Sequence, residues 1–366
     1  MEQPYAEVRM QPFGAMSEFG HEQVLFCRNE HVGLSAIIAI HNTTLGPALG
    51  GCRLYDYASE EDALEDVLRL SRGMTYKAAM AGLDLGGGKA VILGDKSVKS
   101  EALFRAFGRH VDALSGRYIT AEDMNTNVED MNAIRRETQH VTGFGAHLGG
   151  SGDPSPVTAL GVFHGIRACL EVVYGNADVR GRKVAIQGVG NVGYNLARYL
   201  HEAGAEIIAS DINVGNLERA EHEFGATIVD GDDFFRSACD VLAPCAIGGI
   251  INPTSLDLVQ APILCGGANN ILEDETREGA ALVERKITYA PDYVVNAGGL
   301  MNVYAELHGW PPEKAMADTE GIFNTVKQIL HRSQVEGVNS LEAANKIAEE
   351  RIEAVGRLKQ FHLSSN

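Results

Sequence analysis

Two lysines, Lys77 and Lys89, flank a glycine run in the stretch RGMTYKAAMAGLDLGGGK. Gly86–Gly88 precede Lys89, and the apolar run AVIL follows it. A lysine at the head of a buried strand loses solvation free energy unless it has a partner or a chemical role. A phosphate-binding P-loop is excluded, because its pattern needs glycine and Ser or Thr where this chain has Leu83 and Ala90. A surface lysine with a buried stem is the alternative for either residue.

The motif GVGNVG lies between a predicted strand, residues 183–187, and a predicted helix. A lone G-x-G-x-x-G is weak evidence, but Asp211 ends the next predicted strand about 20 residues further on, as in dinucleotide-binding units. We expect a tight turn, close backbone approach to a pyrophosphate and close helix–strand packing at the three glycines, and phosphates at the helix N-terminus. A glycine-rich turn without a ligand is the alternative. The predicted cofactor-binding residues of this unit are Gly188, Gly190, Asn191, Val192, Gly193 and Asp211.

Asp211 also indicates which cofactor binds. A carboxylate there accepts hydrogen bonds from a ribose 2′-hydroxyl and repels a 2′-phosphate, and the following residues, INVG, include no arginine. The sequence therefore favours NAD over NADP. Later predicted strands end in the loops APCAIGG, CGGANN and VNAGG, which should line the ligand crevice of a doubly wound sheet. We accordingly expect Cys245, Ala246, Asn269 and Asn296 around the nicotinamide.

Two successive α/β patterns must position these residues. Strand and helix patterns alternate through the first 140 or so residues, with one helix delivering Lys77 near its C-terminal end. The segment GFGAHLGGSGDPSP is rich in glycine and proline and indicates a domain boundary or hinge. A second pattern follows, with predicted strands at 227–229, 240–243, 262–265, 287–290 and 293–295 and predicted helices at 312–335 and 339–358.

Composition restricts the class of protein. The chain has 366 residues, which favours two domains. A formal net charge of −18 at pH 7 supplies no basic face for nucleic acid or an anionic membrane. The six cysteines show no C-x-x-C spacing, so we expect no metal site. The N-terminus has no signal-peptide pattern, and no run approaches the roughly 20 apolar residues of a membrane span, so we expect a cytoplasmic protein.

The sequence resembles the Glu/Leu/Phe/Val dehydrogenases, a family of NAD(P)-dependent L-amino-acid dehydrogenases, and most closely the leucine dehydrogenase branch. The resemblance runs from about Glu22 to Glu353 in order and spacing. It implies an N-terminal mixed α/β substrate domain (residues 1–145, with a C-terminal helix of about 338–366 packing back on it), a C-terminal Rossmann domain (146–337) and a cleft between them. The matching blocks are TTLGPALGG, RGMTYKAAMAGLDLGGGKAVILGD, RYITAEDMNT, SGDPSPVTALGV, QGVGNVG, APCAIGG, GGANN and APDYVVNAGGLMNV.

The resemblance gives the lysines roles in oxidative deamination, which converts an L-amino acid, water and NAD⁺ to a 2-oxo acid, ammonium and NADH. It implies that Lys77 binds the substrate α-carboxylate and that Lys89 is the catalytic lysine, which activates water against the imine. Asp123 is implied as the carboxylate that exchanges protons at the amino group; without the family match a helix cap is the safer interpretation. The blocks also place Gly50, Thr158 and Asn270 at the substrate or the nicotinamide.

The choice of amino acid depends on apolar positions. Glutamate dehydrogenases carry a lysine where this chain has Leu49 and a small hydroxyl residue where it has Val303, so glutamate should be a poor substrate. Ala121 agrees with the leucine branch, whereas Leu300 resembles the phenylalanine and tryptophan branches. We expect leucine, valine and isoleucine to be favoured, with phenylalanine or tryptophan as the alternative. Met74 should also line the pocket, although any of these apolar residues can be ordinary core.

Two rival classes remain open at this point. A non-catalytic amino-acid or NAD sensor would keep the glycine motif and lose the Lys77, Lys89 and Asp123 set, which is present. A hydroxy-acid dehydrogenase would polarise a carbonyl with a His–Asp or Arg pair, and the twelve histidines form no such motif. The family resemblance further implies a homo-oligomer, an octamer or a dimer.

Overall fold

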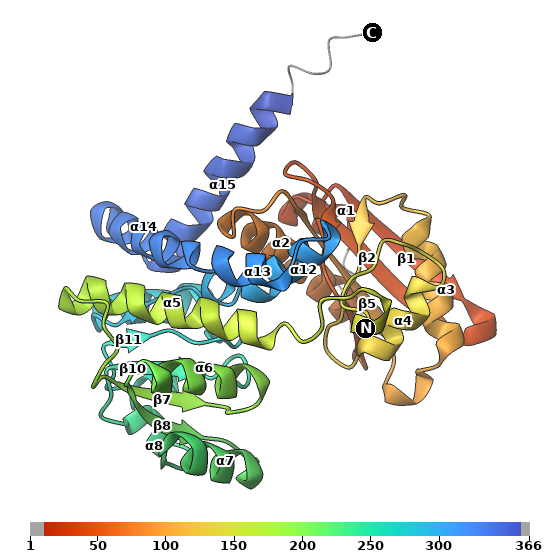
Figure 1. The fold of residues 1–366 in the computed structure, drawn as a ribbon. Coiled ribbons are helices and arrows are strands. Elements are labelled where there is room, and N and C mark those ends of the chain that lie inside the picture. Colours follow the sequence, from red (N-terminus) through yellow and green to blue (C-terminus); the bar gives the residue numbers. More distant parts are fainter. Residues whose placement is uncertain (1–10, 360–366) are drawn as a thin grey trace, which may run out of the picture. The chain divides into compact units, whose positions relative to one another are not determined.

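The computed structural model describes residues 11–359, and only the backbone of Ala146 and Lys359. The chain forms two compact units (Figure 1). One contains the described residues up to Gly152 and those from Arg351 on, and the other runs from Asp153 to Glu350. The boundary after Gly152 lies later than the predicted boundary after residue 145. The boundary before Arg351 lies inside the last helix, whereas the sequence predicted it near residue 338. Residues 1–10, which make up most of the N-terminal segment without a signal-peptide pattern, lie outside the described residues.

The first unit contains a mixed sheet in the order β1-β2-β5-β3-β6, with β4 paired to β5. The β1–β2 and β2–β5 pairs are antiparallel, and β5 pairs in parallel with β3 and β4. The unit's elements are α1 (Pro12–Phe19), β1 (Gln23–Asn29), η1 (Glu30–Val32), β2 (Leu34–Asn42), β3 (Ala48–Leu49), β4 (Cys52–Tyr55), α2 (Glu60–Met80), β5 (Gly86–Leu93), η2 (Lys96–Val98), α3 (Glu101–Asp112), β6 (Tyr118–Ile119), α4 (Val128–Arg135) and η3 (Ala146–Leu148).

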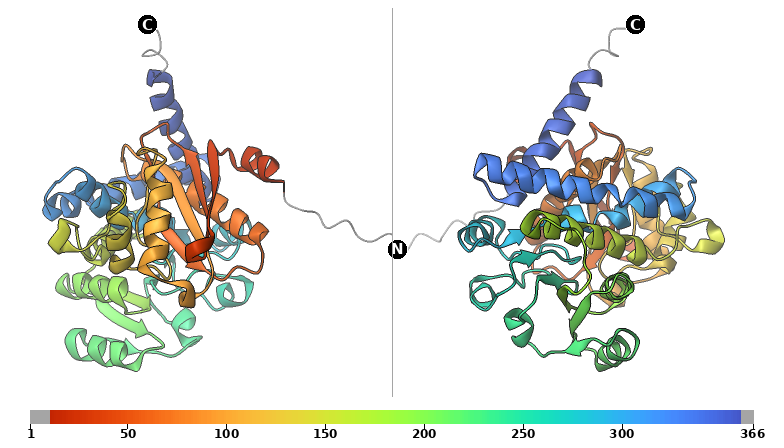
Figure 2. Two further views of the ribbon diagram at one scale, coloured as in Figure 1. Left: turned by 90° about the vertical axis from the view of Figure 1, so that its right-hand side faces the viewer. Right: turned by 60° about the vertical axis from the view of Figure 1, so that its left-hand side comes forward.

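The side chains of these strands alternate between the two faces of the sheet, and each face packs against helices. Ile37 and Val91 face α2, where they join a buried cluster with Val67. Ile38 and Ile92 face the opposite side and join the cluster formed with α3 and α4. Figure 2 shows the orange helix α3 and the yellow helix α4 beside the long red and orange strands. Because side chains of a strand alternate between faces, the face that receives Val91 also receives Lys89.

The glycine run before Lys89 belongs to β5 and is not a turn. A Cβ at Gly87 would lie 2.1 Å from Oγ1 of Thr75 and 2.2 Å from its backbone nitrogen. A Cβ at Gly88 would lie 2.7 Å from the ring of Tyr118. These glycines let β5 approach α2 and Tyr118, so the space beside them is filled by protein.

The second unit is a parallel sheet in the order β12-β11-β10-β7-β8-β9. Read from the other edge, this is the doubly wound order 3-2-1-4-5-6, so the predicted Rossmann fold is confirmed. α5 and α14 lie side by side in this unit (Figure 1). The elements are α5 (Ser155–Tyr174), β7 (Lys183–Gln187), α6 (Asn191–Glu202), β8 (Glu206–Ser210), α7 (Val214–Phe224), β9 (Thr227–Ile228), α8 (Asp233–Arg236), β10 (Val241–Pro244), α9 (Pro253–Leu256), β11 (Ile263–Leu264), α10 (Glu275–Glu284), β12 (Thr288–Tyr289), α11 (Asp292–Val295), α12 (Gly298–Leu307), α13 (Pro312–Asp318), α14 (Gly321–Glu336) and α15 (Ser340–Lys359), of which the part from Arg351 groups with the first unit.

Two predicted elements of the second unit are wrong. Residues 293–295 form the short helix α11 and not a strand. Tertiary packing overrides the β-propensity of the valines, because Val295 fits against Gly161 and Gly165 of α5. The predicted helix at 312–335 is interrupted between α13 and α14.

The length and apolar composition of helix α5 resemble those of a membrane span more closely than we expected from the sequence. Among the described residues it is the one helix long and apolar enough to cross a membrane by length and composition. However, 61% of its apolar window is buried inside the protein, and a core helix passes the same test. Its apolar surface is explained by packing against α6, α12 and α14.

Candidate active site

The two predicted catalytic residues form an ion pair in the first unit. Lys89, on β5, is 5% exposed, and its Nζ donates to Oδ1 of Asp123 at 2.6 Å. Asp123 lies in the loop after β6, and its backbone N–H donates to Oγ1 of Thr126. A Cβ at Gly51 would lie 2.9 Å from Cβ of Asp123, so only glycine lets this loop approach so closely. The structure thus joins two residues that are 34 positions apart in the chain.

A second cation, Arg53 on β4, was missed by the sequence analysis. Its Nε donates to Oδ2 of Asp123 at 2.9 Å, and its Nη1 donates to Oδ2 of Asp66 on α2 at 2.9 Å. Burial raises the pKa of Asp123, but the charges of Lys89 and Arg53 outweigh burial and hold this pKa at about 2. Asp123 is therefore a carboxylate at any pH near neutrality. A charged residue inside the otherwise apolar strand pattern CRLY was the available signal for Arg53.

Helix α2 carries the other predicted residues of this face. Ser59 caps the helix by accepting from the N–H of Asp62, and Lys77 lies in the last turn. Lys77 and Met74 are both partly buried and three residues apart, so they occupy neighbouring positions on one side of the helix. Lys77 remains a predicted carboxylate ligand.

Three predicted substrate-binding residues lie on β3 or directly after β3 and β6. Leu49 is 2% exposed and Ala121 is 9% exposed. The N–H of Gly50 donates to the carbonyl of Ile119, and its carbonyl accepts from the hydroxyl of Tyr118 at 2.6 Å. Its N–H is therefore committed to the fold, and only its carbonyl oxygen keeps a lone pair that a substrate amino group can use.

Two histidines lie beneath the same helix, with ring centroids 4.9 Å apart. His21 contacts Oγ of Ser71 at 2.7 Å, and His41 contacts Oγ1 of Thr75 at 2.7 Å. Burial lowers the pKa of each imidazole to about 4, helped for His21 by the charge of His41 and for His41 by the charge of Arg72. Both rings are therefore neutral near pH 7.

These histidines should make the protein sensitive to mild acid. A group with a lowered folded pKa contributes stability above its unfolded pKa of 6.5, and this stability is lost as the pH falls from 6.5 towards 4. For His41 the expected loss between pH 7 and pH 5 is about 2 kcal/mol. Denaturant unfolding across this range should show a smaller loss in His41→Gln than in the wild type. The exposed His222→Gln is the control, and an unchanged pH dependence in His41→Gln would contradict the assignment.

The glycine motif of the second unit has the geometry of a dinucleotide cradle. Gly188 has φ +84°, and a Cβ there would lie 2.6 Å from Cβ of Ala246, while a Cβ at Gly193 would lie 1.9 Å from the carbonyl oxygen of Gly188. At Gly190, the N-cap of α6, a Cβ would meet nothing within 4 Å. Two of the glycines are thus required by protein packing, and the third borders open space at a helix N-terminus. The helix begins with Asn191 and Val192, whose backbone N–H groups have no partner within the helix and can therefore bind an anion.

Two other predicted cofactor-binding residues directly follow neighbouring strands of the sheet. Asp211 follows β8, and its Oδ2 accepts from the N–H of Val189 at 2.8 Å. Cys245 follows β10, its N–H donates to the carbonyl of Gln187, and burial raises the pKa of its thiol to about 12. The ends of β7, β8 and β10 are therefore tied together at the point where the strand order reverses, which is the ligand crevice of this fold.

The remaining predicted residues of the second unit form two groups. Asn296 donates to Oδ1 of Asn269 at 2.8 Å, while Asn270 is exposed with φ +51°. Thr158 is on α5 and donates to the carbonyl of Pro154, and a Cβ at the neighbouring Gly299 of α12 would lie 2.9 Å from its hydroxyl. Leu300 (5% exposed) and Val303 (partly buried) also lie on α12.

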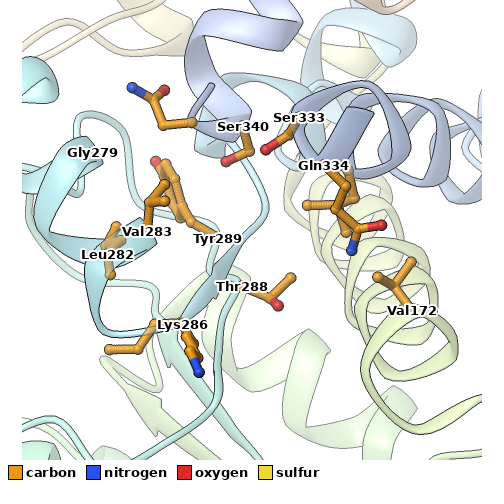
Figure 3. Close-up of a pocket in the computed structure, with 13 residues that line it drawn as sticks. Val172, Gly279, Leu282, Val283, Lys286, Thr288, Tyr289, Ser333, Gln334 and Ser340 are labelled. Atoms are coloured by element: carbon orange, nitrogen blue, oxygen red, sulfur yellow. The ribbon is translucent and has the colours of Figure 1, made fainter. Parts of the chain in front are cut away.

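A cavity of about 320 Å³ also lies in the second unit, away from these residues. Figure 3 shows it between α5, α10, β12, α14 and the start of α15. Among the described residues that line it, Lys286 is the one charged side chain, and none is a predicted site residue. The cavity therefore brings together no acid–base pair. No cluster of three His, Cys, Asp or Glu side chains suited to a metal ion occurs within residues 11–359.

Comparisons with known proteins match both units. Residues 21–140 match the family described as Glu/Leu/Phe/Val dehydrogenase, dimerisation domain. Residues 149–217 and 211–359 match Glutamate/Leucine/Phenylalanine/Valine dehydrogenase. The chain is 51% identical to a leucine dehydrogenase of Bacillus subtilis (strain 168) over 357 residues, which cover 97% of this chain and 98% of the relative. It is 47% identical to a phenylalanine dehydrogenase of Thermoactinomyces intermedius over 354 residues, 96% of each chain.

A solved structure gives the same result. The crystal structure of L-tryptophan dehydrogenase from Nostoc punctiforme matches with a TM-score of 0.85 and 45% identity, over 94% of this chain and 99% of that one. The paired Lys89 and Asp123, the doubly wound second unit and these matches define an amino-acid dehydrogenase that uses a nicotinamide cofactor. The chain belongs to the Glu/Leu/Phe/Val dehydrogenase family.

Proposed function

We propose that the protein catalyses the NAD-dependent, reversible oxidative deamination of an apolar L-amino acid, with leucine, valine and isoleucine favoured. The single observation that carries the proposal is the buried contact of 2.6 Å between Lys89 Nζ and Asp123 Oδ1. It places a basic nitrogen and a carboxylate at one point, as imine hydrolysis requires. Similarity to a leucine dehydrogenase at 51% identity supports the choice of substrate class.

Three residues of the first unit have separate roles in the proposed reaction. Lys77 binds the substrate α-carboxylate as a point charge. The Asp123 carboxylate accepts a proton from the substrate ammonium, which leaves an amine. A nicotinamide cofactor held by the glycine motif of the second unit would supply the hydride acceptor for the substrate Cα, which would convert the amine to an iminium. Lys89, acting in its neutral amine form, then takes a proton from water as the water oxygen attacks the iminium carbon.

The pair of Lys89 and Asp123 also returns protons. Attack of water gives a carbinolamine, whose nitrogen must be protonated before it leaves as ammonia. The contact of 2.6 Å between Nζ and Oδ1 lets a proton pass from one group to the other, so the proton taken from water can be delivered to nitrogen. The products are the 2-oxo acid, ammonium, NADH and one proton, which balances the reaction.

Asp211 supports NAD as the cofactor. Its carboxylate already accepts from Val189 and from the N–H of Asn213. A 2′-phosphate beside it would meet a negative charge, whereas a ribose hydroxyl can donate to its remaining lone pairs. Exposed Ile212 follows, so the adjacent position offers no cation.

A substrate panel tests the proposal. Purified protein should reduce NAD⁺ at alkaline pH with L-leucine, L-valine and L-isoleucine, and should use NADP⁺ poorly. L-glutamate should react at least about 100-fold more slowly in kcat/KM, because the apolar Leu49 and Val303 offer no partner to a side-chain carboxylate. Faster reduction of NAD⁺ with glutamate than with leucine would show that this interpretation of Leu49 and Val303 is wrong.

Phenylalanine or tryptophan is the second candidate substrate. Leu300 favours it, since the leucine branch usually has valine at this place. The 47% identity to a phenylalanine dehydrogenase gives it further support. A higher kcat/KM for L-phenylalanine or L-tryptophan than for L-leucine in the same panel would decide for this alternative. We further propose a cytoplasmic homo-oligomer, an octamer or a dimer; the match of residues 21–140 to a dimerisation domain supports self-association.

A further inference from the structure

Arg53 is connected to the proposed catalytic carboxylate by the topology of the sheet. Arg53 of β4 is the register partner of Val91 on β5. Partners in a parallel pair point to the same face, and residues two apart on a strand share a face. Arg53, Val91 and Lys89 therefore all face α2. The same alternation sends the neighbours of Arg53, Cys52 and Leu54, into the opposite core.

The guanidinium of Arg53 bridges two carboxylates on different elements. Nε donates to Oδ2 of Asp123 and Nη1 donates to Oδ2 of Asp66, each at 2.9 Å. The side chains of Arg53, Asp66 and Asp123 are only 19%, 17% and 22% exposed, so solvent screens these pairs weakly. Such charge-assisted bonds restrict orientation as well as adding energy.

Asp66 is itself held firmly. It lies on α2 next to Val67, which is fully buried against the sheet. Its Oδ2 also accepts from the hydroxyl of Tyr57 at 2.5 Å. Burial raises the pKa of the Tyr57 hydroxyl, and the hydrogen bond to Asp66 adds to this effect, so the hydroxyl stays a donor. The contacts Tyr57–Asp66–Arg53–Asp123 thus connect helix α2, which carries Asp66, to the loop that carries Asp123.

Asp123 needs such a support for the chemistry proposed above. A carboxylate bonded through one oxygen can rotate about its Cβ–Cγ bond, because this torsion has no strong staggered preference. Lys89 holds Oδ1, and Arg53 holds Oδ2. Two donors from different strands fix the carboxylate plane. Misplacement of a reacting group by about 1 Å can lower a rate by about 100-fold.

We propose that Arg53 is a positioning residue of the reaction, which fixes the Asp123 carboxylate so that Oδ1 remains on Lys89, with Asp66 and Tyr57 holding the guanidinium in turn. This inference rests on the proposed roles of Lys89 and Asp123. It adds three supporting residues, Arg53, Asp66 and Tyr57, whose roles neither the sequence blocks nor the family matches assign.

The test is a double-mutant cycle between Arg53 and Asp123. Arg53→Gln should lower kcat for leucine roughly 10- to 100-fold, with a smaller change in KM, because the substrate carboxylate is bound elsewhere. Arg53→Lys, which keeps the charge but not the fork, should recover part of the loss. In an Asp123→Asn background, Arg53→Gln should have no further effect on kcat, since Arg53 acts through the carboxylate.

Controls separate positioning from folding. Arg105→Gln removes another arginine–carboxylate pair of the same unit, with Glu137, and should leave kcat unchanged. Thermal unfolding of every variant reports the structural cost. If Arg53→Gln does not fold, Asp66→Asn leaves the guanidinium in place but loosens it, and should lower kcat in the same direction by a smaller factor.

The outcomes distinguish this inference from the function on which it rests. Wild-type kcat in Arg53→Gln, or an equal fall in both backgrounds, would overturn the positioning role and leave the proposed function intact. Full activity in Asp123→Asn alone would overturn both the role of Asp123 and that of Arg53. A wild-type protein that oxidises none of the amino acids in the panel would overturn the proposed function and this inference together.

Discussion

Replacing Lys89 by alanine should lower kcat for NAD-dependent oxidation of L-leucine by about 10³-fold or more. The variant loses the group that we propose as the base that activates water, and it loses the donor that contacts Asp123. Because Asp123 keeps its pair with Arg53, it is not left as an uncompensated buried charge, and the fold should persist. The measurement is steady-state NADH formation together with thermal unfolding.

Two matched variants sharpen this expectation. Lys89→Arg keeps a cation beside Asp123 but removes a group that can act as a base, and should be nearly as inactive. Lys96→Ala removes an exposed lysine of the same unit and should leave kcat unchanged. NADH binding should survive in all three, since the dinucleotide cradle is built within the second unit. A Lys89→Ala protein within a few-fold of wild-type kcat would contradict the proposed mechanism.

Gly87→Ala should lower the free energy of unfolding by about 3 kcal/mol or more. The new Cβ would lie 2.1 Å from Oγ1 of Thr75, 2.2 Å from its nitrogen and 2.4 Å from the carbonyl oxygen of Ser71. Two of these three atoms are backbone, so a side-chain rotation cannot relieve the overlap. Relief requires β5 to move away from α2, which would also displace Lys89 two residues further along.

Gly73→Ala is the natural control for this variant. Gly73 is exposed on α2, and a Cβ there would meet nothing within 4 Å. Alanine in a helix interior is favoured over glycine, so this change should raise the free energy of unfolding by about 0.5–1 kcal/mol. Chemical denaturation of both variants checks the pair. Equal stabilities would show that β5 is not as close to α2 as described.

Strong local patterns made much of the fold predictable from the sequence. The strand, glycine turn and helix from Lys183 to Glu202 occur as predicted, and the strand has the predicted bounds. Here strand propensity, turn chemistry and helix period agree, so no tertiary contact had to be known. Ser59 and Ser100 cap the starts of α2 and α3 with their side chains, which is a contact local in the sequence.

Long-range packing explains what the sequence could not show. The reason for the glycines before Lys89 is not visible in the sequence, because Gly87 packs against Thr75 and Gly88 against Tyr118, which belong to other elements. Residues 293–295 looked like a strand, because the notch formed by Gly161 and Gly165 that receives Val295 is visible only in the folded unit. In both cases the deciding contact joins separate elements.

The candidate site was predictable in part for a similar reason. Lys89 and Asp123 were predicted through blocks that resemble a known family, and the structure adds that they touch. Asp66 stands out in no motif, and the charge of Arg53 within the strand pattern CRLY does not indicate which residue it contacts. Their relation to Asp123 depends on the register of β4 with β5 and on the placement of α2.

The most direct test of the central claim is the rate of NADH formation by Asp123→Asn in a single turnover. Both wild type and variant would be saturated with NAD⁺ and L-leucine and followed by NADH absorbance. The change keeps the shape of the side chain and an oxygen for Lys89 to contact, and it removes the charge that we propose accepts the substrate proton. We predict a rate lower by about 10²- to 10⁴-fold. A wild-type rate in Asp123→Asn would contradict the assignment of Lys89 and Asp123 as the catalytic pair.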